Sequence, residues 1–307
     1  METMYLTHPA CRLHEMGSWH PESPQRLDAI SDQLLASGLM PYLDDRQAPQ
    51  ASRHDLLRVH TVQYLDDLRG HTPEQGYYPI DPDTLMNPHT YEAALYAAGA
   101  GVAAVDAVIG GEARTAFCAV RPPGHHACRT QAMGFCFLNN VAIAARHALE
   151  QHGLSRVAVV DFDVHHGNGT ENILSNDPRV LMVGIFQHPF YPFSGTEHPA
   201  ANMVNVPIPA YTKGMDVREM IECIWMPRLE EFKPQMLFVS AGFDAHREDE
   251  LGQLGLNEND FTWITSRIRD VANRHAKGRI VSLLEGGYHL DALARSVEAH
   301  VRVLADL

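Results

Sequence analysis

The sequence has little of what marks nucleic-acid-binding, membrane-anchored or disulfide-rich proteins. Its 307 residues include 24 Lys and Arg against 38 Asp and Glu, a formal net charge of −14. This balance argues against a nucleic-acid partner and against a polybasic membrane anchor, because both need clustered basic residues. The five cysteines are odd in number and form no C-x-x-C pair, which indicates reduced thiols rather than disulfides or a cysteine-bound zinc ion. We therefore expect a cytoplasmic location.

Long apolar runs, linkers and repeats are also missing. We expect no segment of the roughly 20 apolar residues that span a bilayer, and the N-terminal residues lack the basic-then-apolar pattern of a signal peptide. No tract rich in Ser, Gly or Pro divides the chain. With 45% hydrophobic residues the chain can bury a full core. We expect one soluble domain over residues 1–307.

What is present is an alternation of strand-like and helix-like apolar segments. The expected strands cover residues 4–6, 115–120, 157–160, 180–185, 236–240 and 280–284, and the expected helices cover 24–35, 55–68, 91–109, 141–149, 217–232, 258–275 and 291–304. In the first helix Leu27, Ile30, Leu34 and Leu35 are expected to point inward. The alternation predicts a three-layer α/β/α domain, with helices on both faces of a central, mostly parallel sheet.

Four of the expected strands are each followed directly by a polar cluster. The clusters are RPPGHH, DFDVHHGNG, AGFDAH and EGGYH. In open parallel sheets, ligands bind in the crevice beyond the carboxyl ends of the strands. Four clusters at equivalent positions therefore predict one shared crevice, which we take as the candidate functional site.

The second and third clusters contain a candidate metal site. Asp161, Asp163 and His165 alternate along the chain, so in an extended segment their side chains point to one side. A catalytic zinc site has three protein ligands and an open position; Asp163 and His165 supply two of them, and Asp244, at a matching strand end, supplies the third. Alone, Asp163 would more often accept loop hydrogen bonds. A Zn²⁺ so bound would activate water and polarise a carbonyl.

The other clusters supply proton-transfer groups. Adjacent His125 and His126 offer a general base and, once protonated, a general acid. Asp161 and Asn168 are expected to bind the far nitrogens of these imidazoles. Only an Asp partner raises the pKa of the imidazole that it binds, so the two histidines should differ in basicity. Tyr288 can donate a hydrogen bond to a developing oxyanion. Taken alone, the histidine pair could be two structural histidines, and Tyr288 could be an ordinary core tyrosine. Together with the metal site, these residues predict amide hydrolysis.

These motifs, together with GFCFLNN, resemble the histone deacetylase and acetylpolyamine amidohydrolase superfamily, zinc-dependent deacylases of the arginase-deacetylase fold. Two details resemble the class II and bacterial branch: the motif HHGNGT, and EGG rather than GGG before the tyrosine. The resemblance implies that Asp163, His165 and Asp244 bind zinc and that Tyr288 polarises the scissile carbonyl. It makes His126 the principal proton shuttle and His125, paired with Asp161, its electrostatic neighbour.

The resemblance also implies a tunnel for the acylated side chain. The lining residues that it indicates are Gly134, Phe135, Phe190 or Tyr191 opposite them, and Leu251 at the mouth. Polyamine-selective members of the superfamily have an acidic gatekeeper residue at the position that we align with Leu251. Because Leu251 is neutral and apolar, the argument for polyamine selectivity is weaker in this chain. The acidic residues 248–250 lie just beside Leu251, so the sequence does not exclude a cationic substrate.

A second cation site is implied in the same way. The family's monovalent-cation site uses backbone oxygens near Asp161, an Asp161 carboxylate oxygen, a serine hydroxyl and a following carbonyl. The serine position is Gly184 in this chain, followed by Ile185. A structural K⁺ at Asp161, Gly184 and Ile185 would need water in place of the hydroxyl. The arginase branch is disfavoured, because its second metal needs an aspartate where Gly167 stands.

The leading hypothesis is a Zn²⁺-dependent deacylase that acts on acylated, for example acetylated, lysine side chains or similar aliphatic amines. An amidohydrolase for acetylpolyamines or other small N-acyl amines is the main alternative, since it would use the same residues. A non-catalytic protein that binds acyl-lysine is the third. The expected partner is an acylated lysine peptide or acylated amine substrate, and we expect no nucleic-acid or membrane partner. The sequence is compatible with a homo-oligomer.

Overall fold

The computed structural model describes residues 3–307, and its centre is an eight-stranded sheet in the order β2-β1-β5-β10-β9-β6-β7-β8. Every strand pair of this sheet is parallel. The strands are β1 (Thr3–Thr7), β2 (Leu43–Gln47), β5 (Thr115–Cys118), β6 (Val157–Asp161), β7 (Val180–Gln187), β8 (Met203–Ile208), β9 (Leu237–Ala241) and β10 (Ile280–Leu284). A separate antiparallel hairpin joins β3 (Tyr78–Pro79) and β4 (Leu85–Met86).

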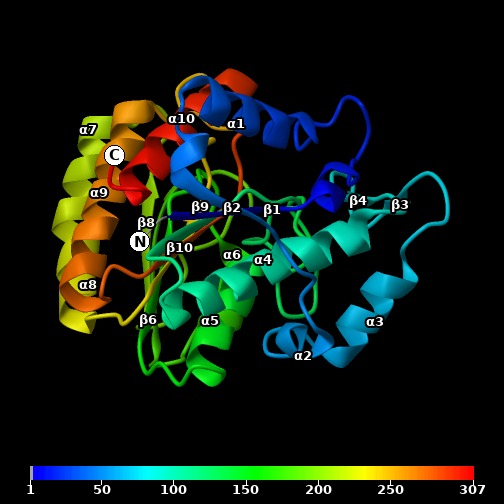
Figure 1. The fold of residues 1–307 in the computed structure, drawn as a ribbon, viewed down its shortest axis with the longest axis horizontal. Helices are drawn as coiled ribbons and strands as arrows, with labels where there is room; N and C mark the ends of the chain where they lie inside the picture. The colour runs from blue at the N-terminus through cyan, green and yellow to red at the C-terminus, as the bar shows by residue number, and fades with distance from the viewer. Residues whose placement is uncertain (1–2) are drawn as a thin grey trace.

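Two groups of helices enclose the sheet (Figure 1). The first group is α1 (Gln25–Ala36), α7 (Gly214–Met220), α8 (Met226–Phe232), α9 (Glu258–His275) and α10 (Leu290–Leu304), and the second is α4 (Thr90–Gly110), α5 (Asn140–Glu150) and α6 (Asn168–Leu174). Helices α2 (Arg53–Leu56) and α3 (Val62–Gly70) lie beyond the second group. Two short 3-10 helices are η1 (Pro9–Arg12) and η2 (Met40–Tyr42), and the π-helical segment η3 (Ile221–Trp225) joins α7 to α8. The α/β/α arrangement with a parallel sheet is therefore confirmed.

Helix α4 corrects one expectation. Among residues 3–307 it is the one helix long and apolar enough, by length and composition, to cross a membrane, whereas no such segment was expected. Its small residues serve a different purpose, because it packs against α5, β1, β5 and β10. A Cβ on Gly99 would lie 1.9 Å from the backbone oxygen of Pro49, so glycine allows the close approach. Gly111, at φ 81°, ends the helix in the left-handed conformation.

Three other expectations are wrong or incomplete. The segment 55–68 is two helices, because Ser52 caps α2 and Thr61 caps a new start at α3. Leu35 was expected to point inward, but it is 60% exposed. Strands β2 and β8 and helix α6 were not predicted. Both strands are at the edges of the sheet. In β2 the polar residues of LDDRQ replace the apolar signal, whereas β8 has the mostly apolar sequence MVNVPI and was missed despite it.

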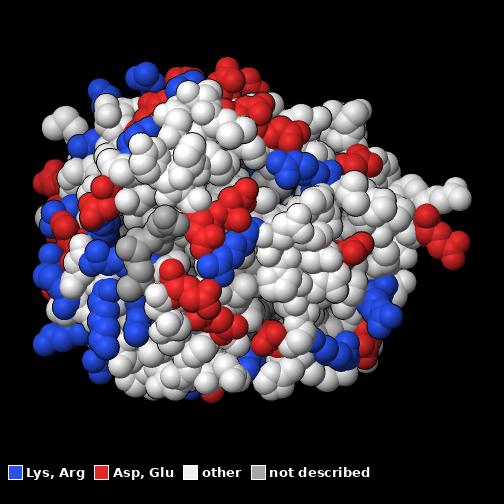
Figure 2. All heavy atoms as spheres, in the orientation of Figure 1, with Lys and Arg blue, Asp and Glu red and all other residues white. Residues whose placement is uncertain are grey.

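The surface mixes charges of both signs. Figure 2 shows acidic and basic side chains interleaved over much of one face, with Lys and Arg most frequent along the edge at which α8 lies in Figure 1. Arg228 and Lys233, in and just after α8, line a surface cavity of about 570 Å³ with Glu231. The charges are therefore not spread evenly over this face.

Candidate active site

The carboxyl ends of four neighbouring strands bring the predicted clusters together. Strands β5, β10, β9 and β6 are adjacent in the sheet, and their four interiors are fully buried. The residues that follow them include His126, Tyr288, Asp244 and His165 in that spatial order. Because parallel strands end on one side, the four clusters meet at one edge, as the sequence predicts.

Asp163, His165 and Asp244 converge on one point. The Nδ1 atom of His165 lies 3.0 Å from Asp163 Oδ1 and 3.2 Å from Asp244 Oδ2. One ligand atom from each of the three residues lies within 4.8 Å of the other two. Asp244 is fully buried, and its Oδ2 has no hydrogen-bond partner among the described residues. A buried carboxylate oxygen that makes no hydrogen bond and lies beside an imidazole nitrogen fits a metal ligand, so these residues could hold a divalent ion.

The pKa shifts of this cluster also fit a site for a divalent cation. Burial and the neighbouring Asp163 raise the pKa of Asp244 to about 7. Burial also disfavours the charged form of Asp163, but His125 and His165 outweigh it and hold the pKa of Asp163 far below its usual value. Two carboxylates that face each other in a buried site repel when both are ionised. A divalent cation would remove that repulsion.

Glycines make room for the two carboxylates. A Cβ on Gly286 would lie 2.0 Å from Asp244 Oδ2, and one on Gly242 would lie 2.0 Å from Asp163 Oδ2. The N–H of Gly286 donates to Asp163 Oδ2 at 2.9 Å. The Gly-Gly pair before Tyr288 therefore brings the backbone close to the metal ligands, and Gly287 turns the chain at φ +118°.

The tandem histidines have the partners that the sequence predicts. Nδ1 of His125 lies 3.0 Å from Asp161 Oδ2, and Nδ1 of His126 lies 2.7 Å from Asn168 Oδ1. An amide oxygen only accepts, so His126 carries its proton on Nδ1 and leaves Nε2 free as a base. His126 lines the cavity described below, whereas His125 is 2% exposed beside Asp161.

The two imidazoles differ in basicity. Burial lowers the pKa of His126 well below 6.5, and His125 and His165 lower it further. Burial opposes the charge on His125 as well, but Asp163 and Asp161 outweigh it and raise the pKa of His125 well above 6.5. The two pKa shifts run in opposite directions, as the different partners of the two imidazoles predict, and make His125 the more basic of the pair.

Glu285 supports the tandem histidines, and sequence reasoning missed it. Its Oε2 accepts the N–H groups of Gly124 at 2.7 Å and His125 at 3.0 Å, and Ser240 Oγ donates to its Oε1 at 3.0 Å. Burial raises the pKa of Glu285 to about 7. The acidic residue at the start of EGGYH was a signal that could have identified it, but its partners lie in the loop after β5 and on β9.

A second support holds the loop of Tyr288. The guanidinium of Arg26 lies 5.0 Å from the centre of the Tyr288 ring and donates to the carbonyl oxygens of Gly287 and Glu285, both at 2.6 Å. Asp249 accepts the N–H of Tyr288 at 2.6 Å. Burial and Asp244 raise the pKa of the Tyr288 phenol well above 10, so it stays a hydrogen-bond donor.

One cavity of about 490 Å³ leads to these groups. His126, His165 and Tyr288 line it, as do all five predicted tunnel residues: Gly134, Phe135, Phe190, Tyr191 and Leu251. Phe190 stacks on His165 with ring centres 5.4 Å apart. The lining also includes Glu250, one of the acidic residues noted beside Leu251, and five residues that were not predicted to line it, which are Asp81, Pro82, Asp83, Gln131 and Met133. Their contribution to substrate binding, like that of the predicted residues, stays a prediction.

Gly134 is required by its position in this cavity. Its φ is +57°, and a Cβ there would lie 2.5 Å from Cδ2 of His126. Any side chain would therefore push the imidazole away from Asn168. The glycine allows the loop to pass directly over the base.

The structure adds no support for the potassium site. Gly184 pairs with Asp161 in the β6–β7 register and contributes no hydroxyl. Asp161 Oδ1 accepts the N–H of Asp163 at 3.1 Å, and its Oδ2 binds His125. A K⁺ ion at Asp161, Gly184 and Ile185 stays a prediction.

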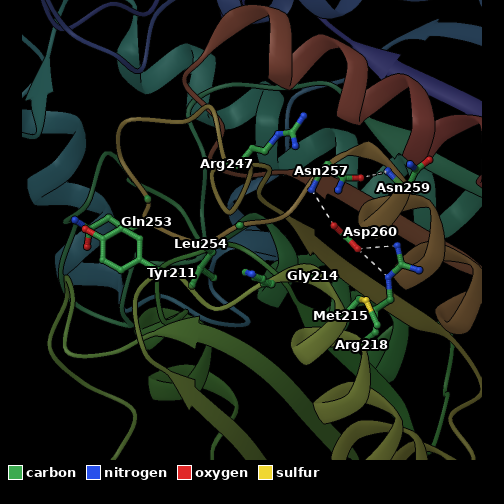
Figure 3. A pocket seen from close by; sticks show the side chains of 13 residues that line it. Tyr211, Gly214, Met215, Arg218, Arg247, Gln253, Leu254, Asn257, Asn259 and Asp260 are labelled. Atoms are coloured by element: carbon green, nitrogen blue, oxygen red, sulfur yellow. Dashed lines mark hydrogen bonds and ion pairs between the residues drawn. The ribbon is translucent and has the colours of Figure 1, made fainter.

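Figure 3 shows a larger cavity of about 690 Å³. Residues 252–255, which directly follow Leu251 in the chain, line it together with exposed Tyr211 and Met215. Its one carboxylate, Asp260, is paired with Arg218 at 2.7 Å. The cavity has no histidine or cysteine in its lining, so the chemistry described above belongs to the smaller cavity.

The chain is similar to known proteins over most of its length. Residues 20–304 match the family described as "Histone deacetylase domain". The chain is 41% identical over 276 residues to a "Histone deacetylase-like amidohydrolase" of Pseudomonas aeruginosa, covering 88% of this chain and 72% of the relative. It is 36% identical to human "Polyamine deacetylase HDAC10", covering 92% of this chain and 44% of that protein. The crystal structure of the HDA15 HD domain superposes with a TM-score of 0.93 at 32% identity, over 99% of this chain and 90% of that one.

Proposed function

The chain belongs to the histone deacetylase family, and from that premise we propose that it hydrolyses the amide bond of acylated lysine side chains or similar acylated aliphatic amines with the help of Zn²⁺. The observation that carries the proposal is the meeting of three functions in one cavity. His126, His165 and Tyr288 line the same 490 Å³ space, and Asp163 and Asp244 lie directly behind His165. A divalent ion at these ligands supplies Lewis acidity, which polarises a carbonyl and lowers the pKa of water.

The residues of the chain then supply proton transfer and charge stabilisation. The free Nε2 of neutral His126 takes a proton from the attacking water, and Asn168 fixes the ring for that step. The phenol of Tyr288 donates a hydrogen bond to the carbonyl oxygen as negative charge develops there. When the C–N bond breaks, the His126 imidazolium returns its proton to the amine nitrogen. The products are a carboxylate and a free amine.

The small-molecule alternative has its own support. Three carboxylate side chains, those of Asp81, Asp83 and Glu250, line the cavity, and negative charge there favours a cationic amine. A relative carries the name polyamine deacetylase. The neutral Leu251 argues in the other direction, since it also lines the cavity. The third hypothesis, a protein that binds acyl-lysine without turnover, is disfavoured by the complete set of proton-transfer groups.

The test measures hydrolysis in the zinc-loaded protein and in two variants. Tyr288→Phe removes the donor to the developing oxyanion, and His126→Ala removes the base. We expect each to lower kcat on the order of 100-fold or more, with the metal content unchanged. Tyr77→Phe and His54→Ala change an exposed tyrosine and histidine and serve as matched controls. Full activity in either active-site variant would exclude the proposed roles.

Substrate choice is measured separately. The ratio of kcat/KM for an acetyl-lysine peptide and for an acetylated polyamine distinguishes the two enzymatic hypotheses. Preference for the peptide supports a lysine deacylase, and preference for the polyamine supports the alternative. Asp83→Asn reduces the negative charge of the cavity lining and should lower kcat/KM more for the more cationic substrate.

A further inference from the structure

A second group of potential metal ligands lies outside the catalytic cavity. Asp106 of α4, His147 of α5 and His152 just after α5 each offer one ligand atom, and the three atoms lie within 4.8 Å of one another. Nε2 of His147 and Nε2 of His152 point at the same carboxylate oxygen, Asp106 Oδ1, at 2.7 Å and 2.6 Å. Two imidazoles and one carboxylate form a donor set that suits divalent transition metals such as Zn²⁺ and Ni²⁺.

A fourth residue places a carboxylate behind one of these imidazoles. The side chain of His147 is 7% exposed, and its Nδ1 lies 3.5 Å from Asp55 Oδ1. This Nδ1 atom is buried and has no hydrogen-bond partner among the described residues. Metal-binding histidines commonly have a carboxylate at the nitrogen opposite the metal, because it fixes the ring and increases its basicity. Asp55 is itself held in place by the Ser52 backbone N–H at 3.0 Å.

The cluster can open to the size that a metal needs. Bonds of about 2.0–2.1 Å to each ligand in tetrahedral geometry separate ligand atoms by about 3.3 Å, compared with the 2.6–2.7 Å observed. Most of this adjustment can come from Asp106, because its side chain is 53% exposed on the surface of α4. His152 lies beyond the end of the helix and is 24% exposed. The buried His147 can stay in place.

We propose that Asp106, His147 and His152 bind one divalent transition-metal ion that links the C-terminal end of α5 to α4. These two helices pack against each other beneath the sheet in Figure 1. The ion would be structural, since none of its ligands lines the catalytic cavity. Asp55 is a positioning residue that orients His147.

The test uses untagged full-length protein whose catalytic site already contains Zn²⁺, titrated with Ni²⁺ by calorimetry. We expect the wild type to bind one further equivalent of Ni²⁺ and to gain thermal stability with it. His152→Gln and Asp106→Asn should weaken this binding on the order of 100-fold, whereas Asp55→Asn should weaken it about 10-fold. His54→Gln changes an exposed histidine of α2 and should bind Ni²⁺ as the wild type does.

Two readouts keep the result independent of folding and of the catalytic proposal. Acyl-lysine hydrolysis should be the same in His152→Gln as in the wild type, which shows that the variant is folded. If hydrolysis is absent from both proteins, the Ni²⁺ titration still decides the present proposal. The proposal is overturned if the wild type takes up no further Ni²⁺, or if His152→Gln takes it up with the same affinity.

Discussion

At the scale of single residues, His300 gives the protein a predictable response to acid. It is fully buried in α10, with Nδ1 2.7 Å from Thr265 Oγ1 and Nε2 2.8 Å from Ser282 Oγ. Burial lowers its pKa to about 3, against 6.5 in the unfolded chain. Between these values the unfolded chain binds the proton and the folded protein does not, so stability falls as the pH falls. From pH 7 to pH 5 the loss from this residue is about 2 kcal/mol.

The variant His300→Gln separates this effect from others. It should be less stable at pH 7, because it disturbs two buried hydrogen bonds, yet its free energy of unfolding in urea should decline less between pH 7 and pH 5. His54→Gln removes an exposed imidazole and is the matched control. An equal decline in His300→Gln and the wild type would contradict the assignment.

A buried network of charges is a second prediction at this scale. Glu22 is fully buried and binds Arg121 through both carboxylate oxygens and Arg26 at 3.0 Å. Burial opposes the charge on Glu22, but Arg121, His14 and Arg26 outweigh it and hold its pKa well below 4.5. Glu22→Gln would leave two buried arginines without a counter-charge and should cost about 3–5 kcal/mol of unfolding free energy.

The matched control for this prediction is an ion pair at the surface. Glu112, 59% exposed in its side chain, pairs with Arg46 at 2.7 Å, and Glu112→Gln should cost less than about 1 kcal/mol. Arg26 also contacts the ring and loop of Tyr288, so Glu22→Gln should lower kcat as well. Equal stability of the two variants would rule out the network as a support of the site.

At the scale of elements, the packing of α4 can be tested with two glycines of the same helix. A Cβ on Gly99 would collide with the backbone of residues 49–51, at 1.9 Å from Pro49 O, whereas one on Gly110 would meet nothing within 4 Å. Alanine favours the helix by about 1 kcal/mol in both cases. We expect a net loss of about 1–3 kcal/mol for Gly99→Ala and no loss for Gly110→Ala, measured by urea unfolding. Equal effects of the two substitutions would mean that the backbone of residues 49–51 moves to accommodate the added methyl group at little cost.

The elements also show what the sequence could predict and why. Strands β5, β6, β9 and β10 are apolar on both faces and were found directly. The edge strand β2, with the sequence LDDRQ, carries no such signal, because one side of it faces solvent. The break between α2 and α3 depends on the caps Ser52 and Thr61, which an uninterrupted apolar pattern concealed.

At the scale of the whole molecule, the sequence predicts the site better where ligands follow strands than where distant segments meet. Asp163, His165 and Asp244 could be paired because parallel strands end together. The contacts of Glu285 with Gly124 and of Arg26 with Gly287 join segments 161 and 261 residues apart, and no local pattern marks them. Asp106 and His152 escaped notice for the same reason, since they meet only when α4 packs on α5.

Metal binding should contribute to the stability of the whole fold. Asp163 and Asp244 are buried and face each other across His165, so the protein without an ion there contains a repulsive pair. An ion that binds only the folded state adds about 2.7 kcal/mol at 100 times its dissociation constant. We expect a chelator to lower the Tm of the His152→Gln variant, in which the second cluster is removed, and Zn²⁺ to restore it. Asp244→Asn, in the same background, removes a ligand charge, and its Tm should respond little to the chelator; an unchanged response would mean that the ion binds elsewhere.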